Sequence, residues 1–168
     1  MNRDIYWMTE ALRDAEQSME EFHELPIATI LVANDNEIGR ETISNVRNNS
    51  FVAHSELLVL MDVEMKILTC ERPLVLYTTL EPCIMCLGAA IECCIDRIVY
   101  AMPAFDGGVG FVSGIIGISK KLPAITSGIM EKEQYKLMKR FIASNNVASP
   151  AWRYVNQLVN QYEAIVGL

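Results

Sequence analysis

The middle of the chain alternates twice between a helical pattern and a strand pattern. Residues 54–68, HSELLVLMDVEMKIL, are apolar nearly all round, as expected of a buried helix. LVLYTT at 74–79 is typical of a short buried strand, residues 83–94 of a second helix, and DRIVYAM at 96–102 of another strand. Strands that are joined through a helix pair in parallel with a right-handed crossover. The pattern therefore predicts an α/β fold with a parallel part in its sheet.

The preceding residues predict one more helix and a hairpin. Apolar side chains recur at steps of three and four over 5–22, which indicates an amphipathic helix. Two strand-like segments, 27–34 and 37–43, flank the turn Asn34-Asp35-Asn36 and predict an antiparallel hairpin. The polar, irregular stretch 44–53 is typical of a loop near a functional edge.

The C-terminal part predicts a loop followed by two helices. Residues 103–114 are glycine-rich and form either a mobile loop over a site or, more commonly for such composition, a plain surface loop. A helix ends the segment 125–142, and Ser149-Pro150 begins a last helix at about 150–166. No repeat or linker interrupts the 168 residues, so we expect one domain spanning 1–168.

Charge and hydropathy limit the classes of partner. The net charge of −7 gives no general attraction for polyanions, so nucleic acid is not the first expectation as partner. No apolar run reaches the length of a secretory signal or a membrane span, and we expect a cytoplasmic protein without a membrane partner. Clustered cysteines in a reducing compartment are more often metal ligands or reactive thiols than disulfides.

Four of the five cysteines fall within the segment 83–94. Cys83 and Cys86 are three positions apart at a helix start, so both side chains can reach one ion. Cys93 lies about 10 Å further along the helix axis, too far for a bond of about 2.3 Å to the same zinc ion. We therefore predict a half-site at Cys83 and Cys86, with Cys93 and Cys94 as small packing residues.

The other half of a metal site requires a further ligand, and the chain has two histidines. His23 ends a helix in a polar setting, which is typical of a solvated surface residue. His54 begins an apolar helix and is followed by Glu56, an acid that either suits the helix dipole or has a functional role. His54, Cys83 and Cys86 together would form an open three-ligand zinc site, the type that lowers the pKa of bound water toward ~7. Glu56 would then transfer protons as a general acid and base.

The motif HSE at 54–56 with PCIMC at 82–86 resembles the H-x-E and P-C-x-x-C signature of the cytidine and deoxycytidylate deaminase superfamily. TLEPCIMCLGAAI at 79–91 and DRIVYA at 96–101 are similar to the branch of bacterial tRNA adenosine deaminases and guanine deaminases. The resemblance covers about residues 5–142. It implies a three-layer α/β/α fold with a mixed five-stranded sheet between helices.

The resemblance also assigns residues to roles. It implies one Zn²⁺ per subunit bound by His54, Cys83 and Cys86, with water as the fourth ligand, and Glu56 as the proton shuttle. Family members commonly hold the base with an asparagine upstream of the histidine. Asn45 is the best match, and Asn48 is the alternative.

Three features depart from the family pattern. Ser55 replaces the alanine usual between the histidine and the glutamate, a small-for-small change that we expect to be tolerated. The segment 103–114 matches neither relative, which leaves the substrate open. The last helix, about 150–166, extends beyond the usual end of the bacterial tRNA enzymes.

Because the chain is acidic, we favour a small-molecule substrate, an aminated nucleobase or nucleoside and by branch a purine, hydrolysed with release of ammonia. Adenosine in tRNA is the alternative, with a basic strip on the penultimate helix as its candidate contact: Lys132, Lys136, Lys139 and Arg140. Two other classes remain, a non-catalytic zinc module that binds a partner and a Cys-x-x-Cys redox enzyme. The resemblance further suggests a homodimer or larger assembly.

Overall fold

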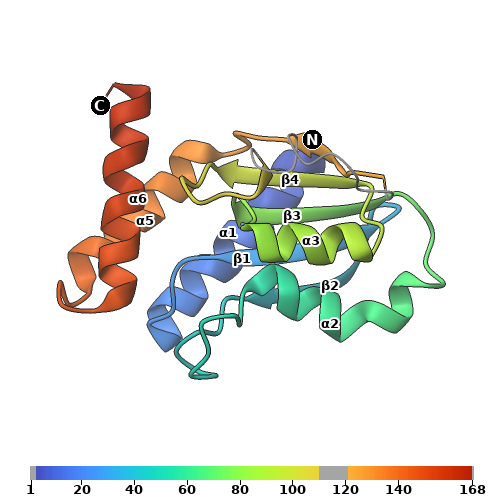
Figure 1. The fold of residues 1–168 in the computed structure, drawn as a ribbon, viewed down its shortest axis with the longest axis horizontal. Helices are drawn as coiled ribbons and strands as arrows, with labels where there is room; N and C mark the ends of the chain where they lie inside the picture. Colours follow the sequence, from blue (N-terminus) through green and yellow to red (C-terminus); the bar gives the residue numbers. More distant parts are fainter. Residues whose placement is uncertain (1–2, 110–120, 168) are drawn as a thin grey trace.

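The computed structural model describes residues 3–109 and 121–167. Helices and strands alternate along the chain and form three layers, with the sheet in the middle (Figure 1). The elements are α1 (Arg3–Phe22), β1 (Ala28–Ala33), β2 (Asn36–Thr42), α2 (Ser55–Ile67), β3 (Leu74–Leu80), α3 (Ile84–Glu92), β4 (Arg97–Met102), β5 (Ala124–Thr126), α5 (Glu131–Ser144) and α6 (Pro150–Val166). The three-layer α/β/α prediction is confirmed.

The sheet is mixed and has the strand order β2-β1-β3-β4-β5. β1 pairs antiparallel with β2 and with β3, whereas β3, β4 and β5 run parallel. The hairpin turns through two residues, Asn34 and Asp35, and both have positive φ angles, 44° and 66°. Such a turn matches the twist of antiparallel strands, and Asn and Asp tolerate it well. The hairpin and the parallel pair that the sequence predicts are therefore both present.

Helices cover both faces of the sheet. α2 and α3 pack on one face, where Val59, Leu87 and Ile91 meet Leu31 and Leu76. α1 and α5 lie on the other face and share a second apolar cluster with β1, β3 and β4. Every residue of β1 and of β3 is buried, as expected of central strands that are covered on both sides.

α6 forms a third apolar cluster at one end of the sheet (Figure 1). The helix begins as the sequence predicts, because Ser149 Oγ accepts a hydrogen bond from Trp152 N and Pro150 occupies the first turn. Its apolar side packs against α5 and against Leu80 and Met102, the last residues of β3 and β4. α6 thus lies at the carboxyl end of the parallel strands, where open α/β sheets usually bind ligands.

Several predictions need correction. The helix at 54–68 is not buried all round, because Met61 and Met65 on α2 are 63% and 70% exposed. Cys93 packs against the α2–α3 cluster as predicted, but Cys94 is exposed, in a left-handed backbone conformation (φ 54°) just after α3. β5 was not predicted from the sequence pattern.

The glycine-rich loop is described only in part, since 110–114 of the predicted stretch 103–114 lie outside the described residues. Within residues 3–109 and 121–167, no helix combines the length and the apolar character needed to cross a membrane.

Candidate active site

Two neighbouring helix N-termini place the three predicted zinc ligands together. His54 is the N-cap of α2 and Cys83 the N-cap of α3, both with extended backbone, and Cys86 lies in the first turn of α3. His54 Nδ1 is 3.6 Å from Cys83 Sγ and 3.5 Å from Cys86 Sγ. The ligand atoms of all three residues lie within 4.8 Å of one another. His23 is exposed and takes no part in this cluster, as predicted.

The spacing of the ligand atoms fits a zinc ion. Zinc binds sulfur at about 2.3 Å and imidazole nitrogen at about 2.05 Å, and at tetrahedral angles this puts the two atoms about 3.6 Å apart. Both nitrogen–sulfur distances have this value to within 0.1 Å. Among the described residues the cluster offers two thiols and one imidazole, and three protein ligands are the number typical of a catalytic rather than a structural zinc site.

The ligands also influence one another electrostatically. A hydrogen bond with the Cys86 thiol lowers the pKa of Cys83 to about 4. The same contact, together with burial, raises the pKa of Cys86 well above its ordinary range. The hydrogen bond with Cys83 raises the pKa of His54. Because zinc binds thiolates and neutral imidazole, metal uptake by these residues must release protons.

Glu56 lies beside the ligands in the first turn of α2. Its side chain is buried, with 4% exposure, and this burial raises the pKa of its carboxyl group. Ser55 Oγ donates a hydrogen bond to Glu56 Oε2 at 3.2 Å. A buried carboxyl group with a raised pKa, in contact with the site of reaction, is the environment that general acid and base catalysis uses.

His54, Glu56 and Cys83 form the floor of a cavity of about 600 Å³. The predicted base-binding residue Asn45 also lines this cavity, and its Oδ1 is buried without a hydrogen-bond partner among the described residues. Asn48, the alternative, is exposed and is not part of the lining. The structure thus brings Asn45 into the same cavity as the zinc ligands, and its role stays a prediction.

Sequence reasoning missed Glu24, which holds the loop that carries Asn45. The Glu24 side chain is fully buried and accepts hydrogen bonds from the backbone N–H groups of Val46, at 3.1 Å, and of Arg47, at 2.8 Å. These bonds fix loop 44–53 immediately after Asn45. A glutamate followed by Leu-Pro carries no sequence signal for this role, because its partners lie 22 and 23 residues away.

α6 and the loop after β4 complete the cavity wall. The sequence allowed two interpretations of this loop, a mobile cover over a site or a plain surface loop, and it did not predict the contacts of α6. Tyr154 on α6 donates a hydrogen bond to Asp106 at 3.1 Å, and its ring packs on Phe105 with centroids 5.8 Å apart. The loop itself lies against the start of α3, because Gly108 N donates to Pro82 O at 2.7 Å. A Cβ at Gly108 would come within 2.7 Å of Ile84 N, so only glycine allows this approach.

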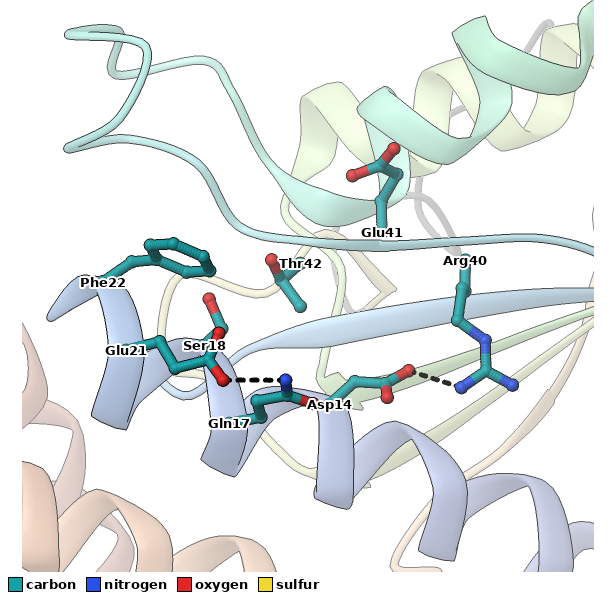
Figure 2. Close-up of a pocket in the computed structure, with 8 residues that line it drawn as sticks. All are labelled: Asp14, Gln17, Ser18, Glu21, Phe22, Arg40, Glu41 and Thr42. Atoms are coloured by element: carbon teal, nitrogen blue, oxygen red, sulfur yellow. Dashed lines mark hydrogen bonds and ion pairs between the residues drawn. The ribbon is translucent and has the colours of Figure 1, made fainter.

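A second, smaller hollow of about 200 Å³ lies between α1 and β2, and Figure 2 shows the residues that line it. Two pairs of its polar groups contact each other: Arg40 lies 2.9 Å from Asp14, and Gln17 donates to Glu21 at 2.9 Å (Figure 2). Ser18 lies in its wall with a buried hydroxyl group. The hollow shares no lining residue with the active-site cavity.

Comparison with known proteins matches residues 1–102 to the cytidine and deoxycytidylate deaminase zinc-binding region. The chain is 36% identical to a tRNA-specific adenosine deaminase of Buchnera aphidicola (subspecies Schizaphis graminum), over 83% of this chain and 94% of the relative. It is 31% identical to the tRNA-specific adenosine deaminase of Bacillus subtilis, over 84% of this chain and 89% of the relative.

Solved structures give the same fold. A deaminase studied for A-to-I editing at the wobble position of transfer RNA superposes with a TM-score of 0.65 at 30% identity, over 79% of this chain and 98% of that chain. The guanine deaminase of Nitrosomonas europaea superposes with a TM-score of 0.64 at 19% identity, over 82% and 83% of the two chains, a likeness of fold alone. The match over the motif-bearing residues and the zinc-compatible geometry agree: the chain belongs to the cytidine and deoxycytidylate deaminase family and is a zinc-dependent deaminase.

Proposed function

We propose that this protein converts adenosine to inosine in tRNA. The observation that carries deamination is the placement of Glu56 in one cavity with His54 and Cys83, which form a ligand cluster with the buried Cys86. The substrate is supported by the two tRNA-specific adenosine deaminases that match more than four-fifths of the chain. This substrate was the alternative in the sequence analysis, and the relatives favour it over a free base.

The chain's own residues supply binding and proton transfer. Zinc, when bound by His54, Cys83 and Cys86, supplies Lewis acidity and lowers the pKa of water toward about 7. Glu56 takes a proton from the attacking water and delivers it to the ring nitrogen; it then takes the second proton from the new hydroxyl group and delivers it to the leaving amine, so that ammonia departs and the base gains an oxygen. The buried position of Glu56 lets it hold each proton between uptake and delivery.

Asn45 binds the base in this proposal. Its amide lies in the cavity wall, and its buried Oδ1 has hydrogen-bonding capacity that no described residue uses. An unpaired buried carbonyl oxygen costs free energy, which a donor on the base would offset. A purine with N–H donors on its edge fits this requirement.

A free aminopurine is a second candidate, favoured by two observations. α6 closes part of the cavity through Ser149, Ala151 and Tyr154, which reduces the opening for a polymer. In the predicted basic strip, Arg140 already pairs with Glu16 and Glu20, and Lys139 pairs with Glu163 at 3.0 Å. These two cations are not free to bind phosphate without breaking an ion pair.

Parallel assays separate the two substrates. The zinc-loaded protein is incubated with bulk tRNA, followed by inosine analysis, and with adenine, guanine, adenosine and guanosine, followed by ammonia release. We expect inosine in tRNA and no ammonia from the free compounds. Ammonia from a free purine with unmodified tRNA would replace the proposed substrate with the second candidate.

We also propose that the protein forms a homodimer. Met61 and Met65 on α2 and Ile84 on the adjacent α3 are each more than half exposed, so α2 and α3 present apolar side chains outward from the sheet. Exposed apolar groups on neighbouring elements often mark a protein interface. Light scattering of the wild-type protein should give the dimer mass, and Met61→Lys with Met65→Lys should shift it toward the monomer. A wild-type monomer would contradict the proposal.

A further inference from the structure

Ser55 occupies a more specific position than a small filler residue. It is the first residue of α2, has no exposed surface, and lies between the zinc ligand His54 and Glu56. Its hydroxyl group lies 2.7 Å from Thr29 Oγ1 on β1 and donates a hydrogen bond to Glu56 Oε2 at 3.2 Å. The side chain therefore joins the carboxylate to the central strand of the sheet.

The hydrogen bonds continue into the sheet and end there. Thr29 Oγ1 also lies 3.2 Å from Thr78 Oγ1 on β3, and both threonines are fully buried. The effect of this row of hydroxyl groups is positional. Because Ser55 gives its one hydroxyl proton to Glu56, its oxygen accepts in the contact with Thr29, and this contact fixes the direction of the Ser55 hydroxyl.

Zinc binding makes this contact more important. When Cys86 is a protonated thiol, it also lies within hydrogen-bonding reach of Glu56. A cysteine that binds zinc does so as a thiolate, which has no proton to donate. Ser55 can still donate to Glu56 Oε2 in that state, and Glu56 lines the active-site cavity.

We propose that Ser55 is a positioning residue that holds the Glu56 carboxylate in the orientation needed for proton transfer, with Thr29 fixing the Ser55 hydroxyl. The inference rests on the proposed role of Glu56 and is independent of whether the substrate is tRNA or a free purine. Misplacement of a proton-transferring group slows the chemical step without weakening substrate or metal binding.

Ser55→Ala tests the proposal. Alanine fits the space and suits a helix, so the variant should fold and bind one zinc ion per chain. We expect kcat to fall about three- to tenfold, the effect of one lost hydrogen bond, with KM and zinc content unchanged. An unchanged kcat, or a rise in KM as large as the fall in kcat, would overturn the proposal.

Thr29→Val tests the second part, because valine has the shape of threonine without its hydroxyl. The single variant should lower kcat less than Ser55→Ala does, and the double variant should match Ser55→Ala alone. Ser18→Ala is the matched control: Ser18 is equally buried but lies in the α1–β2 hollow (Figure 2), and its removal should leave kcat unchanged. Additive effects of Ser55→Ala and Thr29→Val in the double variant would contradict a shared role of Ser55 and Thr29.

A structural readout separates this inference from the proposed function. In a crystal structure of zinc-loaded Ser55→Ala, the Glu56 side chain should occupy more than one rotamer, whereas the wild-type side chain should occupy one. A single, unchanged rotamer in the variant would overturn the inference. If the wild type formed no inosine in tRNA but Glu56 still occupied several rotamers in Ser55→Ala and one in the wild type, only the proposed substrate would be overturned.

Discussion

The active-site cavity has a floor and a wall, and their side chains are held in different ways. The floor residues His54, Cys83 and Glu56, together with the buried ligand Cys86, lie at or next to the N-termini of two helices that pack on the same face of the sheet. The wall consists of loop 44–53, the loop after β4, and α6, a helix that packs at the end of the sheet. Floor positions are fixed by regular structure, whereas wall positions depend on a few individual contacts.

This difference assigns separate roles to the two regions. The floor supplies the metal ligands and the proton carrier, which any hydrolytic deamination requires. The wall supplies Asn45 and Tyr154, which determine the shape and hydrogen bonding that a base meets. We therefore expect floor variants to abolish turnover and wall variants to change substrate affinity.

Cys86→Ala should give the largest effect. It removes a buried zinc ligand, so zinc content should fall well below one per chain and activity should drop by more than about a hundredfold, measured by metal analysis and inosine formation. Cys93→Ala, on the same helix but outside the ligand cluster, is the matched control and should retain both. Full activity in Cys86→Ala would remove Cys86 from the metal site.

Asn45→Ala should give the next largest effect and should act on binding. Loss of one hydrogen bond to the base should lower kcat/KM about tenfold, mainly through KM, while zinc content stays at one per chain. Asn48→Ala changes the same residue type outside the cavity and should have no effect. Equal effects of the two variants would show that the assignment of Asn45 is wrong.

Glu24→Gln should give a smaller change in the wall. The amide oxygen can still accept a hydrogen bond from Arg47 N, but the charge-assisted interaction with two N–H groups is weakened. We expect KM to rise a few-fold, with a loss of about 1 to 2 kcal/mol in the free energy of unfolding measured with urea. Glu21→Gln, on the exposed side of α1, is the control. If Glu24→Gln lowered kcat and left KM unchanged, Glu24 would not act through the cavity wall.

Arg140→Ala should give the smallest effect. Its ion pairs with Glu16 and Glu20 are on the surface, so stability should change by no more than about 1 kcal/mol. At 50 mM and at 150 mM salt, the variant should form inosine at the same rate as the wild type at that salt concentration. A large loss on tRNA alone would instead assign the strip on α5 to substrate binding.

The floor could be predicted from the sequence because its residues are encoded by short spacings. The Cys83–Cys86 separation and the position of His54 at a helix start define the ligand set without knowledge of distant contacts. The order of the first strands and helices follows from apolar periodicity for the same reason. Residues whose partners are near in the chain, and residues that lie at a helix end, can be recognised from the local sequence.

Asn45 in the wall was assigned only through the family resemblance, and the other wall contacts could not be predicted, because they join distant residues. Glu24 binds loop 44–53, and Tyr154 binds Asp106 across 48 positions. The contact of Ser55 could not be predicted either, because Ser55 begins α2 and its partner Thr29 lies on β1, 26 positions away. Local patterns failed in two further places: the short β5 has exposed residues and no apolar period, and Cys94 follows the end of α3, where the chain turns away from the core.

Glu56→Gln in the zinc-loaded protein tests the central claim most directly, because it removes proton transfer and keeps the size of the side chain. Zinc content and inosine formation in tRNA are measured on the same preparations of wild type and variant. We predict one zinc ion per chain in both, with inosine formation lowered by about a hundred- to ten-thousandfold in the variant. Equal rates in the two proteins, or a wild type that deaminates without zinc, would contradict the account.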